Sequence, residues 1–191
     1  MRLRVEINNR PAFMQLVSSG QINCVAPDGI GSGEVNVVVT TAAGSSEVFR
    51  VTAAARAPAL MAPPAFRAGD RQYVVAIFPD LTFAGPEGLI PGAPFRPAMA
   101  DERVVLYGIG FGATTPAIPV GQIAAQAGIL PNVEARFGDT PAQVEYAAVA
   151  GGFVSLYQFN VVVPAGASGD VRLFVTVDGV AVTQELWITT K

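Results

Sequence analysis

The sequence predicts an all-β protein made of two related sandwich domains, of which the first is incomplete. Three observations lead to this prediction. The 20 glycines and 15 prolines are spread along the 191 residues, a distribution that leaves little room for a long helix and is typical of short strands joined by tight turns. Several short stretches alternate apolar and polar residues, as half-buried strands do. One of these stretches occurs twice.

The repeat opens with a block of the form Gln-x-Asn-x-x-x-Pro. Its defining positions are Gln21, Asn23 and Pro27 in the first copy and Gln158, Asn160 and Pro164 in the second. The separation of the copies has the size of a domain, not of a solenoid unit. Because proline cannot donate a hydrogen bond to a neighbouring strand, each block predicts a strand that ends at its proline. We expect the amide side chains to hold a neighbouring loop by its backbone, in preference to binding a ligand.

A hairpin is predicted after each block. In the second copy, alternate residues from Val171 to Val177 are apolar, and Asp178-Gly179 can form a two-residue turn because both positions accept a positive φ. The chain then returns along residues 180–188. The first copy predicts a strand over residues 33–40, a longer turn over 41–46 and a return strand over 48–51.

The remaining strands and the domain boundary follow from the turn residues. Further strands are expected over residues 72–78, 103–107, 133–137 and 143–149, and the proline-rich residues 85–97 predict a long surface loop. An alanine-rich stretch interrupted by prolines places the boundary so that residues 1–57 form a partial domain and residues 58–191 a complete one.

The first domain has few residues ahead of its Gln-x-Asn block, so it is expected to lack opening strands. The N-terminal residues show no apolar leader, which leaves the native start of the protein open. We expect the open sheet edge near Met1 to Val17 to pair with another chain, giving a homo-oligomer, or with the Ala65 to Phe83 segment.

Composition excludes several classes of function. The net charge is −3, and the 12 basic residues form no run, which argues against nucleic-acid binding. The chain has no histidine, which removes Ser-His-Asp catalysis and histidine-dependent zinc sites, and its single cysteine, Cys24, is expected to be a buried thiol. The uncharged stretch over residues 104–133 is interrupted by glycine and proline, so no membrane span is expected.

The run Gly108-Ile109-Gly110-Phe111-Gly112 fits the loose glycine pattern of dinucleotide-binding loops. That mechanism needs a helix directly after the glycines, and Pro116 and Pro119 preclude one. We therefore expect these glycines to make a tight turn against a sheet, without a cofactor.

Acid–base chemistry is left to pairs of carboxylates. The candidates are Asp70, Asp80, Glu87, Asp101, Glu102, Asp139 and Glu145, and none lies in a catalytic motif. No calcium-loop pattern is present. The sequence accordingly predicts a protein that is not an enzyme and carries no metal site, although a calcium site built from scattered loop carboxylates stays open.

The glycine run after the predicted strand Val104–Tyr107 resembles the opening of an immunoglobulin-like IPT/TIG domain. Together with the paired Gln-x-Asn blocks and Pro58-Ala59-Leu60, it makes the chain similar over nearly its full length to an uncharacterised tandem module found near the C-terminal end of large secreted bacterial proteins, notably acidobacterial ones. The resemblance implies an immunoglobulin-like β-sandwich and an extracellular or cell-surface location. It implies no catalytic residues, and this chain departs from it by its short first copy.

Two hypotheses for function follow. The first is a non-catalytic structural, adhesion or assembly module of a larger surface or secreted protein. The alternative is a carbohydrate-binding module whose exposed aromatic rings stack on sugars, with Phe83, Phe95 and Phe111 as candidates. The expected partner is accordingly a protein or a polysaccharide of the cell envelope.

Overall fold

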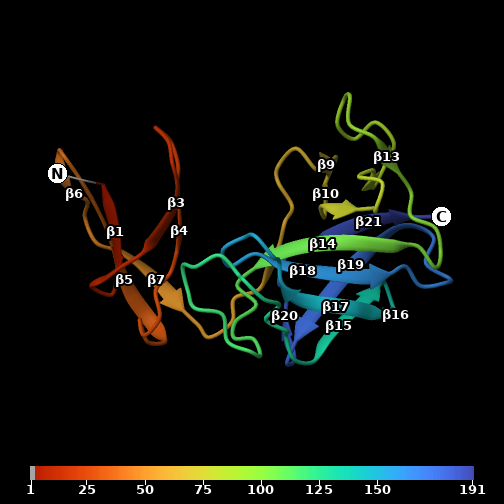
Figure 1. The fold of residues 1–191 in the computed structure, drawn as a ribbon. Coiled ribbons are helices and arrows are strands. Elements are labelled where there is room, and N and C mark those ends of the chain that lie inside the picture. Colours follow the sequence, from red (N-terminus) through yellow and green to blue (C-terminus); the bar gives the residue numbers. More distant parts are fainter. Residues whose placement is uncertain (1–2) are drawn as a thin grey trace.

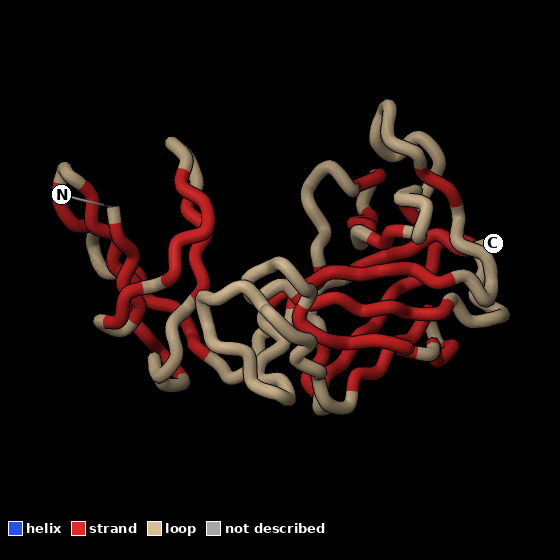
Figure 2. The backbone as a smooth tube through the Cα atoms, viewed as in Figure 1, coloured by secondary structure: helices blue, strands red, loops and turns tan. Residues whose placement is uncertain are grey.

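The computed structural model describes residues 3–191. The protein is all-β, as predicted: strands follow one another along the described chain without a helix (Figures 1 and 2). Figure 1 shows the strands in two groups, β1 to β7 and β8 to β21, which we call the N-terminal and C-terminal units. No helix among these residues is long and apolar enough to cross a membrane.

The strands of the N-terminal unit are β1 (Arg4–Ile7), β2 (Arg10–Pro11), β3 (Phe13–Val17), β4 (Ile22–Val25), β5 (Gly33–Thr41), β6 (Gly44–Ser45) and β7 (Phe49–Ala53). Those of the C-terminal unit are β8 (Ala59–Leu60), β9 (Arg67–Ala68), β10 (Arg71–Tyr73), β11 (Ala76–Ile77), β12 (Phe83–Ala84), β13 (Phe95–Arg96), β14 (Arg103–Ile109), β15 (Val133–Phe137), β16 (Thr140–Ala142), β17 (Val144–Val149), β18 (Tyr157–Val162), β19 (Gly169–Val177), β20 (Val180–Ala181) and β21 (Leu186–Thr190).

The C-terminal unit is a β-sandwich. One sheet has the order β16-β15-β19-β21-β10-β9, with β20 beside β19, and the other has the order β13-β12-β11-β14-β18-β17, with β8 beside β14. Alternate side chains from both sheets fill one core, for example Leu106 of β14, Phe159 of β18 and Val175 of β19. Each such apolar side chain contributes about 1.5–3 kcal/mol by leaving water.

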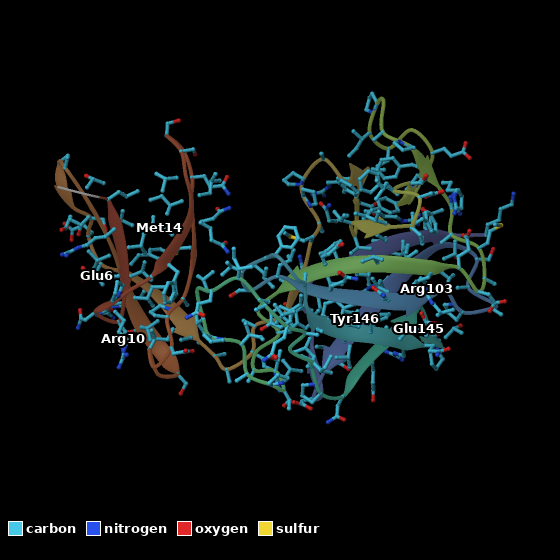
Figure 3. The ribbon with its side chains drawn as sticks, in the orientation of Figure 1. Glu6, Arg10, Met14, Arg103, Glu145 and Tyr146 are labelled. Carbon is cyan, nitrogen blue, oxygen red and sulfur yellow. The ribbon has the colours of Figure 1, made fainter. Side chains whose placement is uncertain are left out.

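The N-terminal unit is built from a sheet of order β2-β1-β5-β6, with β7 beside β5, and a separate β3–β4 hairpin. Its core is small: Val5, Ile7 and Val35 are buried, and partly buried side chains such as Met14 pack around them. Figure 3 shows Met14 between the hairpin and β1. The cores of the two units are separate clusters.

The seven strands of the N-terminal unit match the last seven strands of the C-terminal unit one for one. Strands β1, β2, β5, β6 and β7 pair with one another in the same way as β15, β16, β19, β20 and β21. The β3–β4 hairpin matches β17–β18, and both hairpins shift register at the same place, between Met14 and Leu16 and between Val144 and Tyr146. Within the described residues, the N-terminal unit therefore keeps a counterpart of β15 and lacks counterparts of β8 to β14, in line with the expected loss of opening strands.

In both copies a tight turn reverses the chain after the long strand, β5 or β19. Asp178 and Gly179 both have a positive φ, of 46° and 75°, which confirms the predicted two-residue turn. In the first copy the turn is shorter than predicted, because β6 already pairs with the end of β5, placing Ser45 opposite Thr40.

The Ala65 to Phe83 segment does not pair with the N-terminal unit, so that part of the prediction was wrong. Its strands extend the sheets of the C-terminal unit: β10 lies parallel to β21, and β11 lies antiparallel to β14. These positions give the segment two long strands as partners within its own unit, and its apolar residues enter that unit's cores.

The segment that connects the two units packs against the glycine run. The Ala57 N–H donates to the Gly110 carbonyl at 2.9 Å, and β8 pairs with the end of β14, placing Leu60 opposite Gly108. A Cβ at Gly108 would lie 2.6 Å from the carbonyl oxygen of Ala59. Residues 113–132 form no helix. The glycines thus allow close backbone packing beside a sheet, as predicted.

Arg56 fastens this connection to the C-terminal unit. Its guanidinium donates to the Phe111 carbonyl at 2.7 Å and forms an ion pair with Asp178, and the Arg56 side chain is largely shielded from solvent. We expect Arg56→Ala to lower the free energy of unfolding by about 2 kcal/mol, because its charge-assisted hydrogen bonds to the Phe111 carbonyl and to Asp178 are lost. Urea unfolding measures the change.

The matched control is Arg50→Ala, since Arg50 forms an exposed ion pair with Glu34. Exposed pairs contribute about 0–1 kcal/mol, so this variant is expected to stay close to the parent. Equal losses in the two variants would contradict the role given to Arg56.

A hydrogen-bonded carboxylate joins three strands of the β16-β15-β19-β21-β10-β9 sheet. Asp170 of β19 accepts hydrogen bonds from Thr189 of β21 at 2.6 Å, from Tyr73 of β10 at 2.8 Å and from Arg71 at 2.6 Å. Burial alone would raise the pKa of Asp170, but these bonds and the Arg71 charge outweigh it, so the pKa lies below the ordinary value of 3.8.

Acid is therefore expected to weaken the fold partly through Asp170. Because its folded pKa is lowered, the carboxylate contributes stability that is full above the unfolded pKa and is lost as the pH falls through the folded pKa. Asp170→Asn should lower stability at neutral pH and flatten its decline below about pH 4. Urea unfolding of both proteins between about pH 2 and 7 tests this. If the free energy of unfolding of the variant falls with acid as steeply as that of the parent, other carboxylates cause the loss of stability.

Candidate functional site

The inner face of the N-terminal unit exposes apolar side chains whose counterparts in the C-terminal unit are buried. Phe49 of β7 lies opposite Val37 of β5, as Leu186 of β21 lies opposite Leu173 of β19. Yet Phe49 is 69% exposed, whereas Leu186 is 2% exposed. The two positions have the same place in the fold but different environments, because the β3–β4 hairpin alone faces the first sheet, whereas a seven-stranded sheet faces the second.

The neighbouring position on the same strand repeats this contrast. Val51, opposite Val35, is 37% exposed, and its counterpart Ile188, opposite Val171, is fully buried. Apolar side chains left in water mark a surface that gains free energy when it is covered, by roughly 25 cal/mol per Å² of apolar area.

The β3–β4 hairpin forms the other wall of this open sandwich. Ile22 and Cys24 of β4 are half-buried against the small core, whereas their counterparts in β18, Phe159 and Val161, are buried. Burial raises the pKa of the Cys24 thiol, which therefore stays protonated at neutral pH. The prediction of a buried thiol is met in part.

A cleft of about 620 Å³ lies beside this hairpin, where it meets the C-terminal unit. Its lining includes Cys24 and Val25 on the hairpin side, and Ile109 and Ala117 on the opposite side. Gln15 spans the gap by donating to the Val154 carbonyl at 3.2 Å. Apolar and backbone groups dominate these walls, an arrangement that suits an extended polypeptide better than a small charged ligand.

The rings proposed for sugar stacking do not form an exposed platform. Phe111 is fully buried and packs against Phe159, with ring centroids 4.6 Å apart. Phe95 is buried and stacks on the half-buried Phe83 at 5.0 Å, and Phe66 meets both rings edge-on. The expected exposure of these rings is therefore corrected.

The reason lies in the proline-rich loop. Leu89, Ile90 and Ala93 pack against the cluster of Phe66, Tyr73 and Phe95, so the loop has a small core of its own. Residues 85–97 form less of a free surface loop than predicted. Apolar residues between its prolines were the signal for this packing.

Two of the seven acidic candidates, Glu102 and Glu145, form ion pairs with arginines. The carboxylate of Glu102 accepts hydrogen bonds from the two terminal guanidinium nitrogens of Arg96, at 2.7 and 2.9 Å. These bonds lower the pKa of Glu102, although burial opposes the shift. Glu145 pairs with Arg103 across β18, and Figure 3 shows the two side by side. Within residues 3–191, no three potential ligands among Cys, Asp and Glu are placed to hold a metal ion.

The amide side chains of each Gln-x-Asn pair bond to each other, not to a neighbouring loop. Gln158 donates to Asn160 at 2.9 Å, and Gln21 donates to Asn23 at 2.7 Å. The two amides lie two residues apart on one strand face and therefore reach each other directly. The strands end at Val25 and Val162, shortly before Pro27 and Pro164, as the prolines predict.

The fold and this surface define a class: an all-β protein with one complete sandwich and one open to further packing. No protein-family model matches the chain, and a search of curated proteins finds no significant match.

Proposed function

We propose that the chain is a non-catalytic assembly module of a larger extracellular or cell-surface protein, built from two immunoglobulin-like units related to IPT/TIG domains. One observation carries the proposal: the N-terminal unit repeats seven strands of a complete sandwich and leaves its inner face uncovered, with Phe49 69% exposed where Leu186 is 2% exposed. Association with another polypeptide would complete this unit.

The exposed apolar face of the N-terminal unit supports an assembly role over that of a simple spacer. A spacer needs each unit to be closed, since an exposed apolar face only adds a risk of aggregation. An assembly module instead keeps one sandwich open and gains affinity from the apolar area that its partner covers.

Binding to cell-envelope fractions tests the proposal. The purified chain is expected to bind envelope proteins saturably, to lose this binding in Phe49→Glu and to keep it in Val180→Glu. Val180 is a suitable control because it is an exposed apolar residue of β20, away from the open face. Circular dichroism confirms that each variant is folded.

Insoluble polysaccharides serve as the second matrix in the same experiment. Equal protein binding by the parent and Phe49→Glu would contradict an assembly role for the open face. Saturable retention on a polysaccharide that survives Phe49→Glu would favour the carbohydrate-binding alternative through residues other than Phe95 and Phe111.

A further inference from the structure

The C-terminal unit contains a template for what the open sandwich lacks. Its strand β18 is paired on both edges, with β17 on one side and β14 on the other. Strand β14 runs antiparallel to β18 and places Val104 opposite Val161 and Leu106 opposite Phe159. All four side chains lie in the core.

Strand β4 is the counterpart of β18 and has a free edge. Within residues 3–191 it pairs only with β3, which takes the place of β17. The repeat aligns Ile22 with Phe159 and Cys24 with Val161. An unpaired edge beside half-buried apolar side chains is a site for strand addition, because main-chain hydrogen bonds and apolar contacts form together.

We propose that β4 accepts an extended strand from a different polypeptide. The donor runs antiparallel to β4, carries apolar residues at every second position, and sets two of them opposite Ile22 and Cys24. This inference rests on the proposed assembly function and adds the chemistry and register of the partner.

Strand β14 also explains why the donor is not a second copy of this chain. The sequence pattern that fits the edge is that of β14, which is already held by β11, β18 and β8. Its inward residues Val104 and Leu106 have no exposed surface, so a second copy cannot release them without losing its own core.

The cleft beside the hairpin provides an approach to this edge. In the template, Arg103 at the start of β14 lies opposite Val162, the counterpart of Val25. Val25 lines the cleft, so the N-terminal end of the donor would enter there. The opposite wall offers apolar contacts from Ile109 and Ala117.

A synthetic peptide with the sequence of residues 101–110 tests the register, because Cys24 is the only cysteine of the chain. Two peptides carry an activated mixed disulfide at a cysteine, one with Val104→Cys and one with Val105→Cys. The reaction is run at mildly alkaline pH, where part of Cys24 is thiolate; when this thiolate attacks the peptide sulfur, a protein–peptide disulfide forms and the activating thiol leaves. The first peptide places its sulfur beside Cys24 on the inner face, and the second places it on the opposite face.

We expect trapping to be about tenfold faster with Val104→Cys than with Val105→Cys, because disulfides need close and correctly directed Cβ atoms. Hydrogen exchange with the unmodified peptide gives a readout without a cysteine: the amides of β4 should gain protection, and a scrambled peptide should give none.

Equal trapping of both peptides, or unchanged exchange of the β4 amides, would overturn the proposal. A dimer linked through the two copies of Cys24 that the peptide cannot dissociate would identify a second copy as the occupant and also overturn it. The envelope-binding experiment separates the two levels: binding that depends on Phe49 with no peptide protection at β4 would reject this strand site and leave the assembly function in place.

Discussion

Gly110→Ala is expected to lower the free energy of unfolding by about 3–5 kcal/mol, one of the largest effects of any single methyl group in this chain. A Cβ at Gly110 would lie 2.1 Å from the carbonyl oxygen of Ala57, and the residue has a φ of +76°. The connection cannot simply withdraw, because Ala57 donates its N–H to the carbonyl of Gly110 at 2.9 Å. Thermal and urea unfolding measure the loss.

Gly138→Ala separates the clash from backbone strain. Gly138 also has a positive φ, of +58°, but a Cβ there would meet no atom within 4 Å. We expect this variant to lose only about 1–2 kcal/mol, the cost of the left-handed conformation. Similar losses in free energy of unfolding for Gly110→Ala and Gly138→Ala would mean that the backbone at Ala57 moves away from the added methyl group at little cost.

Truncating Leu186 should lower the free energy of unfolding far more than truncating Phe49, although the two residues hold corresponding places in the repeat. Leu186→Ala is expected to cost about 2–5 kcal/mol, because it leaves a cavity in a filled core. Phe49→Ala removes a larger side chain that is 69% exposed, and its cost is expected to be within about 0.5 kcal/mol. Urea unfolding of both variants gives the comparison.

The same pair of variants examines whether the open face is real in solution. A cost above about 2 kcal/mol for Phe49→Ala would mean that the isolated chain already covers this residue. That result would remove the observation on which the assembly function rests. A small cost for Leu186→Ala would instead show that the core of the complete sandwich repacks readily.

Local sequence patterns were sufficient to predict much of the fold. The Asp178-Gly179 turn follows from two residues that accept a positive φ, and both do. The paired Gln-x-Asn blocks located corresponding strands in the two units, because a repeated sequence with the same alternation folds in the same way. The match between β1 and β15 was missed because Arg4–Ile7 and Val133–Phe137 share only an alternation of burial, not residues.

The candidate site was less predictable, because exposure is decided by strands far apart in the sequence. Leu186 lies in a core that includes Val104 and Leu106 of β14, whereas β4 pairs only with β3 within residues 3–191 and Phe49 is exposed. Phe95 was expected at the surface, yet Phe83, Phe66 and the apolar residues of its own loop enclose it.

The sequence by itself determined the all-β class, the repeat, the turns and the glycine run, because each depends on backbone preferences and alternation over a few residues. Only the tertiary structure decided which sheet edge is free and which apolar side chains are left in water. Those properties depend on the pairing of distant strands, and a strand's own residues do not specify whether its second neighbour is present.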